Sequence, residues 1–387
     1  MKILIVSAMF PPTITGTAFY TKNLAATLTS MGHQVSVVTI DRKGTKKETF
    51  PFKVVRLKSL QFPLRNYFKH FSLTSIFPGN YSTMSRICKQ DGKPDAIVLV
   101  NQYLDISFPA IYASVANRIP LYVSIGTQIQ SLNPFRNKIL NILDRLIIGN
   151  LIYPFARKII CWDKEIERYV NDIQKRKFAN KTIIIPFGVD SGLKNFLKGH
   201  SYKIHNQILG VGAVIGHRNF IFNIRVFKEL LKKYPELNLK IIGHVYDKET
   251  VNLVNKLKLG SKVLFTGELP HEQVLRELQV SDIHWMMLDG EYKGLGTSNL
   301  EAMLMGVPIA SNVPENLLGE GLLKDMKNCI LVDDRSIEEA VGKITAVLED
   351  ENIRKGIGTQ GKEFVRKNMS WEKIGKMHEN LFKENSH

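Results

Sequence analysis

The sequence has few cysteines and no long apolar run, and both shortages limit what the protein can be. Cys88, Cys161 and Cys329 are the three cysteines among 387 residues. Their odd number and wide spacing match neither a disulfide framework nor a metal site, so we expect a reducing compartment. The run that comes closest to a membrane span, Leu146–Ala156, lies between arginines and is shorter than the roughly 18 residues needed.

The N-terminal segment lacks the features of a signal peptide. Met1–Pro12 carries one lysine and a short apolar run that ends at two prolines, without a small-residue cleavage site. We interpret it as a buried first strand. With 44% hydrophobic and 23% charged residues, the chain has the composition of a soluble globular protein of two or three domains. We expect a cytoplasmic protein. Peripheral attachment to the inner face of the plasma membrane is a second option that fits this expectation.

Acidic residues are missing from one long segment, although the whole chain has a net charge of +17. Such a charge favours an anionic partner, which is nucleic acid, acidic lipid or a phosphorylated substrate. No Asp or Glu occurs in segment 49–90. Basic and aromatic side chains alternate there, namely Phe50, Phe52, Lys53, Arg56, Lys58, Phe62, Arg65, Tyr67, Phe68, Lys69, Phe71, Phe77, Tyr81, Arg86 and Lys89. This mixture suits an anionic membrane surface or single-stranded nucleic acid, and equally a partly buried, solvated connection.

Apolar runs alternate with amphipathic segments, and this pattern restarts once along the chain. The first half predicts a helix at Tyr20–Met31 and strands at Ile3–Ala8, Val35–Ile40, Ala96–Val100, Leu121–Ile125, Lys158–Trp162 and Thr182–Ile185. The second half predicts strands at Gln207–Gly212, Leu239–Gly243, Val263–Gly267, Ile283–Leu288, Pro308–Ser311 and Ile330–Val332, and helices at Phe220–Lys233, Thr250–Lys258, His271–Val280, Ile337–Leu348 and Ile353–Lys367. Continuous apolar strands separated by helices indicate two α/β halves with parallel sheets covered on both faces.

The stretch 293–311 carries the clearest functional signal. Gly294 and Gly296 allow the backbone to approach a ligand, and a helix that begins at Ser298 offers free N–H groups for an anion. Glu301 follows one turn later, so the stretch suits a sugar linked to a diphosphate. The alternative is a capping box in which Glu301 only bonds back to the backbone of Ser298.

Strand order adds to this interpretation. In open parallel sheets, ligands bind beyond the carboxyl ends of the strands. The loops around Gly16 and Gly294 both follow strands. We therefore expect them to face one cleft between the two halves.

A series of short motifs runs through the chain in a fixed order. They are Phe10–Gly16, Met31–Val35, Pro94–Ile97, Ile185–Asp190, Val211–Gly212, Arg218–Asn219, Leu239–Gly243, Val263–Gly267, Leu300–Ile309 and Ser370–Glu372. In order and spacing they resemble the retaining glycosyltransferases of family 4, the group 1 transferases with a GT-B fold, over almost the whole chain. The resemblance implies two doubly wound Rossmann-like domains: an acceptor-side domain over 1–190, a linker over 191–205, a nucleotide-sugar domain over 206–370, and a last helix, 371–387, that crosses back.

The same resemblance implies a nucleoside-diphosphate sugar as donor. Glu301 would accept hydrogen bonds from ribose hydroxyls, and the amides of Thr297, Ser298 and Asn299 would face the diphosphate. Arg218 stands where the family has a phosphate-binding lysine, and its guanidinium grips phosphate oxygens with two donors.

The remaining implied contacts lie in loops. Thr15 and Gly16 belong to the phosphate loop of the first domain, and Asn219 follows the cationic Arg218. Gly243, with backbone near Phe265, would recognise the base.

Three positions depart from the family pattern. Lys293 replaces the first of two glutamates, and three interpretations stay open: it meets phosphate, it meets a carboxylate on the donor sugar, or it points to solvent. Ala213 replaces an arginine, so Arg218 carries more of the phosphate binding. In the first domain, Gly126 and Thr127 occupy the stretch where the family has a histidine, and Thr127 offers only a hydrogen bond to a sugar.

The resemblance further implies transfer of a hexose-type sugar with retention, without a protein nucleophile, metal or other cofactor. Arg218, Lys293 and Thr127 are the candidate catalytic residues. The expected acceptor is a saccharide or a lipid-linked saccharide, because segment 49–90 lies in the acceptor-side domain. Two alternatives stay open: a catalytically impaired homologue that binds nucleotide sugar or glycan, and a nucleic-acid binder, which has charge in its favour but no recognition motif.

Overall fold

The computed structural model describes residues 1–13, 15–41, 49–61, 72–90, 92–103, 105–129, 131–189 and 205–384. The chain divides into two compact units, Met1–Gly188 with Trp371–His387 and Val189–Ser370. Of the expected linker 191–205, only His205 falls within the described residues. The cleft between the two units stays a prediction.

The first unit is built on a seven-stranded parallel sheet. Its strands are β1 Lys2–Val6, β2 Gln34–Ile40, β3 Lys53–Leu57, β6 Ala96–Val100, β7 Leu121–Ile125, β8 Ala156–Cys161 and β9 Thr182–Ile184. They lie in the order β3-β2-β1-β6-β7-β8-β9. Every residue of β6 and β7 is buried, because helices cover both faces of the sheet.

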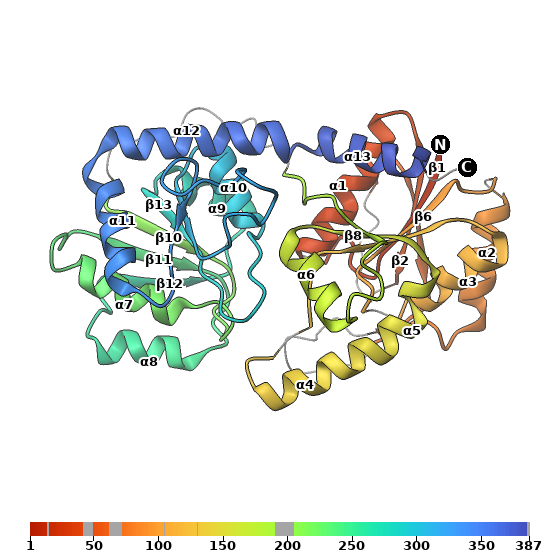
Figure 1. Ribbon diagram of the computed structural model, residues 1–387, viewed down its shortest axis with the longest axis horizontal. Coiled ribbons are helices and arrows are strands. Elements are labelled where there is room, and N and C mark those ends of the chain that lie inside the picture. Colours follow the sequence, from red (N-terminus) through yellow and green to blue (C-terminus); the bar gives the residue numbers. More distant parts are fainter. Residues whose placement is uncertain are drawn as a thin grey trace. The chain divides into compact units, whose positions relative to one another are not determined.

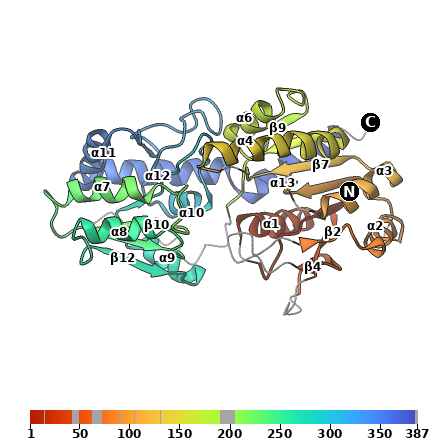
Figure 2. The same cartoon turned by 90° about the horizontal axis from the view of Figure 1, so that it is seen from below.

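Helices connect these strands, as Figures 1 and 2 show. They are α1 Gly16–Ser30, α2 Pro78–Gln90, α3 Ser107–Asn117, α4 Pro134–Leu143, a π-helical turn at Asp144–Ile148, α5 Gly149–Leu151, a 3₁₀ turn at Tyr153–Phe155, α6 Lys164–Ile173 and α13 Trp371–Glu384. In Figure 1, α1 and α13 lie on one side of the sheet and α2 and α3 on the other. Within the described part of the chain, no helix combines the length and apolarity needed to cross a bilayer.

The second unit contains a six-stranded parallel sheet. Its strands are β10 Gln207–Val211, β11 Asn238–Ile242, β12 Val263–Gly267, β13 Ile283–Trp285, β14 Ile309–Ser311 and β15 Ile330–Leu331, in the order β12-β11-β10-β13-β14-β15. Its helices are α7 Phe220–Leu230, α8 Lys248–Lys256, α9 His271–Gln279, α10 Thr297–Met305, α11 Ile337–Glu349 and α12 Glu351–Asn368. The prediction of two parallel α/β sheets is confirmed.

Segment 49–90 is more ordered than a solvated connection. Its described residues form β3, α2 and a short antiparallel pair, β4 Leu60–Gln61 with β5 Ser72–Leu73. Phe50 packs against Phe10 with ring centroids 5.0 Å apart, and Phe52 is buried beside them. Part of its aromatic content therefore belongs to the core, while residues 62–71 lie outside the description.

A buried polar network holds the last helix, α13, in the first unit. Tyr20 on α1 lies 3.0 Å from Nε2 of His378 on α13, and Ser124 at the end of β7 donates to the Tyr20 hydroxyl. Trp162 Nε1 donates to Ser124 at 2.9 Å. His378 Nδ1 bonds to the Ile374 carbonyl, and burial lowers the pKa of His378 to about 4. A neutral imidazole that donates through Nδ1 must accept at Nε2, so Tyr20 donates to it.

Gly375 sets the distance between α13 and α1, which predicts a large effect of valine there. An added side chain would begin 2.7 Å from Thr27 Cγ2 and 2.8 Å from Met31 Sδ, closer than ordinary contact. We expect Gly375→Val to lower the free energy of unfolding in urea by about 1–3 kcal/mol. Gly356→Val in α12 is the matched control, since nothing lies within 4 Å of the added carbon, and should change it by less than about 0.5 kcal/mol. Equal losses in both variants would contradict close packing at α13.

Candidate functional site

The candidate site of the second unit lies at the carboxyl edge of its sheet. Strand β10 pairs with β11 on one side and with β13 on the other. The connections that follow β10 and β13 therefore leave in opposite directions and open a crevice at their carboxyl ends. The predicted residues Arg218 and 293–301 come from these two connections.

Arg218 lies directly over the end of β10. Its Nη1 donates to the Val211 carbonyl at 3.2 Å and lies 3.0 Å from Met286 Sδ. A side chain at Gly212, which has a φ of 147°, would begin only 1.5 Å from this nitrogen. Position 212 must therefore be glycine for the guanidinium to lie there.

Gly243 makes a second close approach at the same edge. Its N–H donates to the Gly267 carbonyl, and an added carbon would lie 2.2 Å from the carbonyl oxygen of Gly212. The turns after β10 and β11 thus pack backbone against backbone. The predicted base-recognition residue Gly243 is adjacent to the predicted phosphate site.

Helix α10 begins at Thr297, one residue before the predicted start. Its N-cap is Gly296 with a φ of 73°, and no side chain caps the helix. The capping-box alternative is therefore wrong, because Glu301 bonds elsewhere. The first-turn N–H groups, which include those of Thr297, Ser298 and Asn299, have no acceptor within the helix and carry its positive dipole end.

Ser298 is positioned from beneath by His284 on β13. His284 is fully buried, and this burial lowers its pKa to about 4. Its Nδ1 lies 3.0 Å from the Leu209 carbonyl and must donate there. Its Nε2 then accepts from the Ser298 hydroxyl at 3.3 Å. A neutral imidazole thereby links β10, β13 and the start of α10.

Glu301 faces α9 and not its own helix start. Its Oε1 lies 2.9 Å from Nε2 of His271, the first residue of α9. The Glu301 side chain is 12% exposed and that of His271 is 54% exposed. The carboxylate is therefore largely shielded, with one edge open to solvent beside the imidazole.

Lys293 is held in an ion pair. Its Nζ lies 2.7 Å from Oδ2 of Asp334, which also accepts from Asn312 at 2.6 Å. Asn312 in turn bonds both the N–H and the carbonyl of Leu288 after β13. The ammonium that replaces the family's glutamate is thus neutralised within the second unit.

Two predicted binding residues use their side chains for local structure. Asn219 caps α7, with its Oδ1 accepting from the N–H of Phe222 at 3.2 Å. Asn299 is buried and donates to the Leu295 carbonyl at 2.5 Å. Gly294 lies in the same loop, between β13 and α10. The backbone N–H of Asn219 donates to the Met287 carbonyl at 3.2 Å, so of these two residues only the backbone amide of Asn299 remains for a ligand.

In the first unit, the predicted residues also follow strands of the sheet. Thr15 caps α1, its Oγ1 accepting from Ala18 N–H at 3.1 Å, and Gly16 is the first residue of that helix. Thr127 lies after β7 and accepts from Asn101, after β6, at 3.3 Å. The crevice between β1 and β6 thus lies near both positions.

The position of Trp162 explains why residue 126 is a glycine. A side chain there would overlap the indole of Trp162, whose Cε3 lies 1.7 Å from the position of the added carbon. The indole is fixed by its hydrogen bond to Ser124. The family's histidine therefore has no room at this position unless Trp162 moves.

Three residues with clear structural roles, His271, His284 and Asp334, were not predicted from the sequence. Their partners lie 30, 14 and 41 residues away along the chain. No local pattern marks such pairs. For His284, the one available signal was an imidazole within an otherwise apolar strand.

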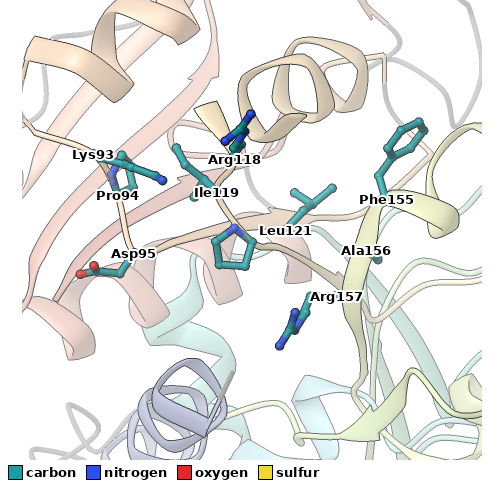
Figure 3. A pocket seen from close by; sticks show the side chains of 10 residues that line it. Lys93, Pro94, Asp95, Arg118, Ile119, Leu121, Phe155, Ala156 and Arg157 are labelled. Atoms are coloured by element: carbon teal, nitrogen blue, oxygen red, sulfur yellow. The ribbon is translucent and has the colours of Figure 1, made fainter. Parts of the chain in front are cut away.

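A separate pocket of about 680 Å³ lies in the first unit. Figure 3 shows the side chains of Lys93, Arg118 and Arg157 around it, from the segments that enter β6, β7 and β8. It therefore lies at the amino edge of the sheet, opposite to Gly16 and Thr127.

Among the described residues, no three His, Cys, Asp or Glu side chains gather in a way that suits a metal ion.

The two parallel α/β sheets define a two-domain fold of the GT-B type. Family models match the chain as Glycosyltransferase Family 4 over residues 14–193 and as Glycosyl transferases group 1 over residues 192–364. The chain belongs to the group 1 glycosyltransferases, and this part of the expected identity is confirmed.

Proteins that are similar to this chain in sequence agree with this assignment. An uncharacterised glycosyltransferase of Methanocaldococcus jannaschii is 27% identical over 64% of this chain and 63% of its own length. The alpha-monoglucosyldiacylglycerol synthase of Acholeplasma laidlawii is 25% identical over 94% of this chain and 91% of its own length.

Solved structures show the same fold at low identity. Anabaena HepE in complex with UDP has a TM-score of 0.73 and 16% identity, covering 99% of this chain and 100% of that one. It has also been solved with UDP-glucose. Sucrose-phosphate synthase of Thermosynechococcus elongatus has a TM-score of 0.71 and 17% identity, covering 99% and 98%.

The buried neutral His284 makes stability depend on pH. Its pKa is about 4 in the folded chain and about 6.5 when unfolded, so the unfolded state binds more protons between these values. Acidification through this window should lower the free energy of unfolding by about 3 kcal/mol from this group alone. His378 and the carboxylates also make the free energy of unfolding depend on pH, but they do so equally in the wild type and in the His284→Asn variant. Urea unfolding from pH 7 to 4.5 should therefore show a smaller decline for the variant, and parallel declines would contradict a neutral His284.

Gly212→Ala should be costly because Arg218 occupies the space. Both the positive φ and the overlap with Nη1 oppose a side chain, so we expect a loss of about 1–3 kcal/mol in the free energy of unfolding. Gly342→Ala in α11, with nothing within 4 Å, is the control and should stabilise by up to about 1 kcal/mol. A neutral Gly212→Ala would show that the guanidinium does not lie over β10.

Proposed function

We propose that the second unit binds a nucleoside-diphosphate sugar and that the protein transfers the sugar with retention to a saccharide or lipid-linked acceptor. One observation carries this proposal: Arg218 lies over the carboxyl end of β10, close to the uncapped N-terminus of α10, and Glu301 follows one turn inside that helix. A fixed cation and open helix N–H groups suit a diphosphate, and a nearby carboxylate suits vicinal hydroxyls. The solved UDP complexes of HepE support a uridine nucleotide through likeness of fold alone.

The diphosphate would meet both Arg218 and the first amides of α10. The bond from Ser298 to His284 directs the serine side chain away from the ligand and leaves its N–H available. Lys293 contributes to this site only when a ligand oxygen replaces Asp334 as its partner, because the ammonium is already paired. Arg218 is therefore the main cation for the departing diphosphate.

The ribose would be recognised by Glu301. Two vicinal hydroxyls can donate to the two oxygens of one carboxylate. His271 holds Oε1 of Glu301 and thereby fixes the carboxylate in a single orientation. This arrangement would favour a ribonucleotide over a deoxyribonucleotide.

Transfer with retention would need no protein nucleophile. The acceptor oxygen attacks the anomeric carbon from the face that the diphosphate leaves, the bond between that carbon and the diphosphate oxygen breaks, and this oxygen takes the acceptor proton. The protein stabilises the developing charge through Arg218 and the α10 amides and positions the sugar, with Thr127 offering a hydroxyl. Thr15 and Gly16 begin α1, whose dipole end would add a second anion-binding surface.

The acceptor would belong to glycolipid or polysaccharide synthesis. The relative from Acholeplasma laidlawii is named as a glycolipid synthase, and a Staphylococcus aureus relative, 21% identical over 69% of this chain, as a capsular polysaccharide biosynthesis glycosyltransferase. The net charge of +17 favours work at an anionic leaflet. A protein that binds nucleotide sugar without transfer is the second candidate, favoured by the neutralised Lys293 and by Gly126 beneath Trp162.

Thermal unfolding in the presence of nucleoside diphosphates tests the donor site, because a ligand of the folded state alone must raise its stability. We expect a shift with one nucleotide family, UDP first, and at least tenfold weaker binding by Glu301→Gln, which loses charged hydrogen bonds. Glu229→Gln on α7, whose carboxylate pairs with Lys232 on the surface, should bind like the wild type.

The outcomes separate the two candidates. Turnover of the nucleotide sugar with retained anomeric configuration, read by NMR of the product, supports the transferase. Binding without transfer or donor hydrolysis across many nucleotide sugars favours the impaired homologue. No shift with any nucleotide overturns the donor site.

A further inference from the structure

Helix α4 carries its apolar side chains on the outside of the first unit. None of its residues is buried. Phe135 is 73% exposed, and the apolar side chains around it are each at least 43% exposed. We call this set the apolar ridge: Leu132, Phe135, Ile139, Ile142, Leu143, Leu146, Ile147, Leu151 and Phe155. Figure 2 shows α4 as a long element along the unit, near α6.

The ridge follows one face of a continuous helical stretch, 134–151. With about 3.6 residues per turn, Phe135, Ile139, Ile142 and Leu146 point the same way. The opposite face is anchored by Asp144, which is buried and bonds Tyr169, at 2.9 Å, and Gln174. Burial raises the pKa of Asp144, while these hydrogen bonds oppose the rise. The anchor therefore fixes the ridge outward.

Within segment 131–155, the exposed charged side chains are all positive. Asp144 is the single acidic residue from 131 to 155, and it is buried on the inner face. Arg136 and Lys138 are both exposed and lie on either side of the line of apolar side chains. A second copy of this face would bring like charges together, whereas an anionic surface would attract it.

The end of the ridge adjoins the basic pocket of the first unit. Phe155 is one of the residues that line the pocket, together with Lys93, Arg118 and Arg157 (Figure 3). The one carboxylate there, Asp95, accepts the N–H of Lys2 at 2.7 Å. Three cations beside an exposed aromatic side chain suit the phosphate of a lipid headgroup.

We propose that the apolar ridge inserts into the interfacial layer of an anionic membrane, with Arg136, Lys138 and the basic pocket against lipid phosphates. An exposed apolar stripe flanked by basic side chains is the composition of a helix that lies in the membrane interface. The inference rests on the proposed function in one respect, since it brings the acceptor-side unit to a lipid-linked acceptor. The proposed insertion differs from electrostatic adhesion through segment 49–90, because salt screens the attraction between charges but does not screen the burial of apolar side chains.

Tryptophan placed in the ridge tests insertion directly. With vesicles that contain phosphatidylglycerol, Phe135→Trp should show a blue-shifted emission and quenching by brominated lipid, after subtraction of the wild-type signal. Val115→Trp on α3 is the matched control, because Val115 is also exposed in the same unit, at 56% against 73% for Phe135, and lies outside the ridge. No quenching at position 135, or equal quenching at both positions, would overturn the inference.

A polar ridge gives the second test. The triple variant Phe135→Ser, Ile139→Ser, Ile142→Ser should bind these vesicles at least tenfold more weakly than the wild type in 0.5 M salt, while Val115→Ser binds normally. Unchanged vesicle binding by the triple variant would overturn the inference. So would ridge-dependent dimerisation in sedimentation without vesicle binding, which would identify a second copy as the occupant. The thermal shift with UDP reports separately on the proposed donor site, and it should persist in the triple variant.

Discussion

The placement of β10 between β11 and β13 is the constraint on which the candidate site depends. The chain passes from β10 to β11 in one direction and from β13 to β14 in the other, so the connections after β10 and β13 lie on opposite faces of the sheet. The loop with Arg218 and the loop that ends at α10 therefore meet at one edge, although about 80 residues separate them in the chain. Without this order, Arg218 and α10 would not lie at the same edge of the sheet.

Backbone geometry and one neutral imidazole set the positions of Arg218 and the start of α10. Gly212 leaves room for the guanidinium of Arg218, and the bonds of His284 to Leu209 and Ser298 fix the start of α10. Burial keeps this imidazole neutral, so it positions the helix without adding charge beside Arg218.

Much of the fold could be predicted, because the buried strands of a parallel sheet are continuous apolar runs that can be recognised in the sequence. Strand β6 is entirely apolar and entirely buried, and such runs occur in both halves. Edge strand β3 was not predicted because most of its side chains are only half buried. Helix α4 was not predicted because it has no buried face. The capping-box alternative failed because serine and glutamate at this spacing have other partners, His284 and His271, that approach from distant segments.

The sequence by itself determined the two α/β halves, the glycine-rich stretch before Glu301 and the excess of positive charge, because periodicity, residue type and net charge are local properties. Only the tertiary structure decided which side chains meet. The pairing of Lys293 with Asp334, the room that Trp162 takes at Gly126 and the outward face of α4 all depend on packing between remote segments. Such contacts are fixed by strand order and burial, and these are properties of the folded chain as a whole.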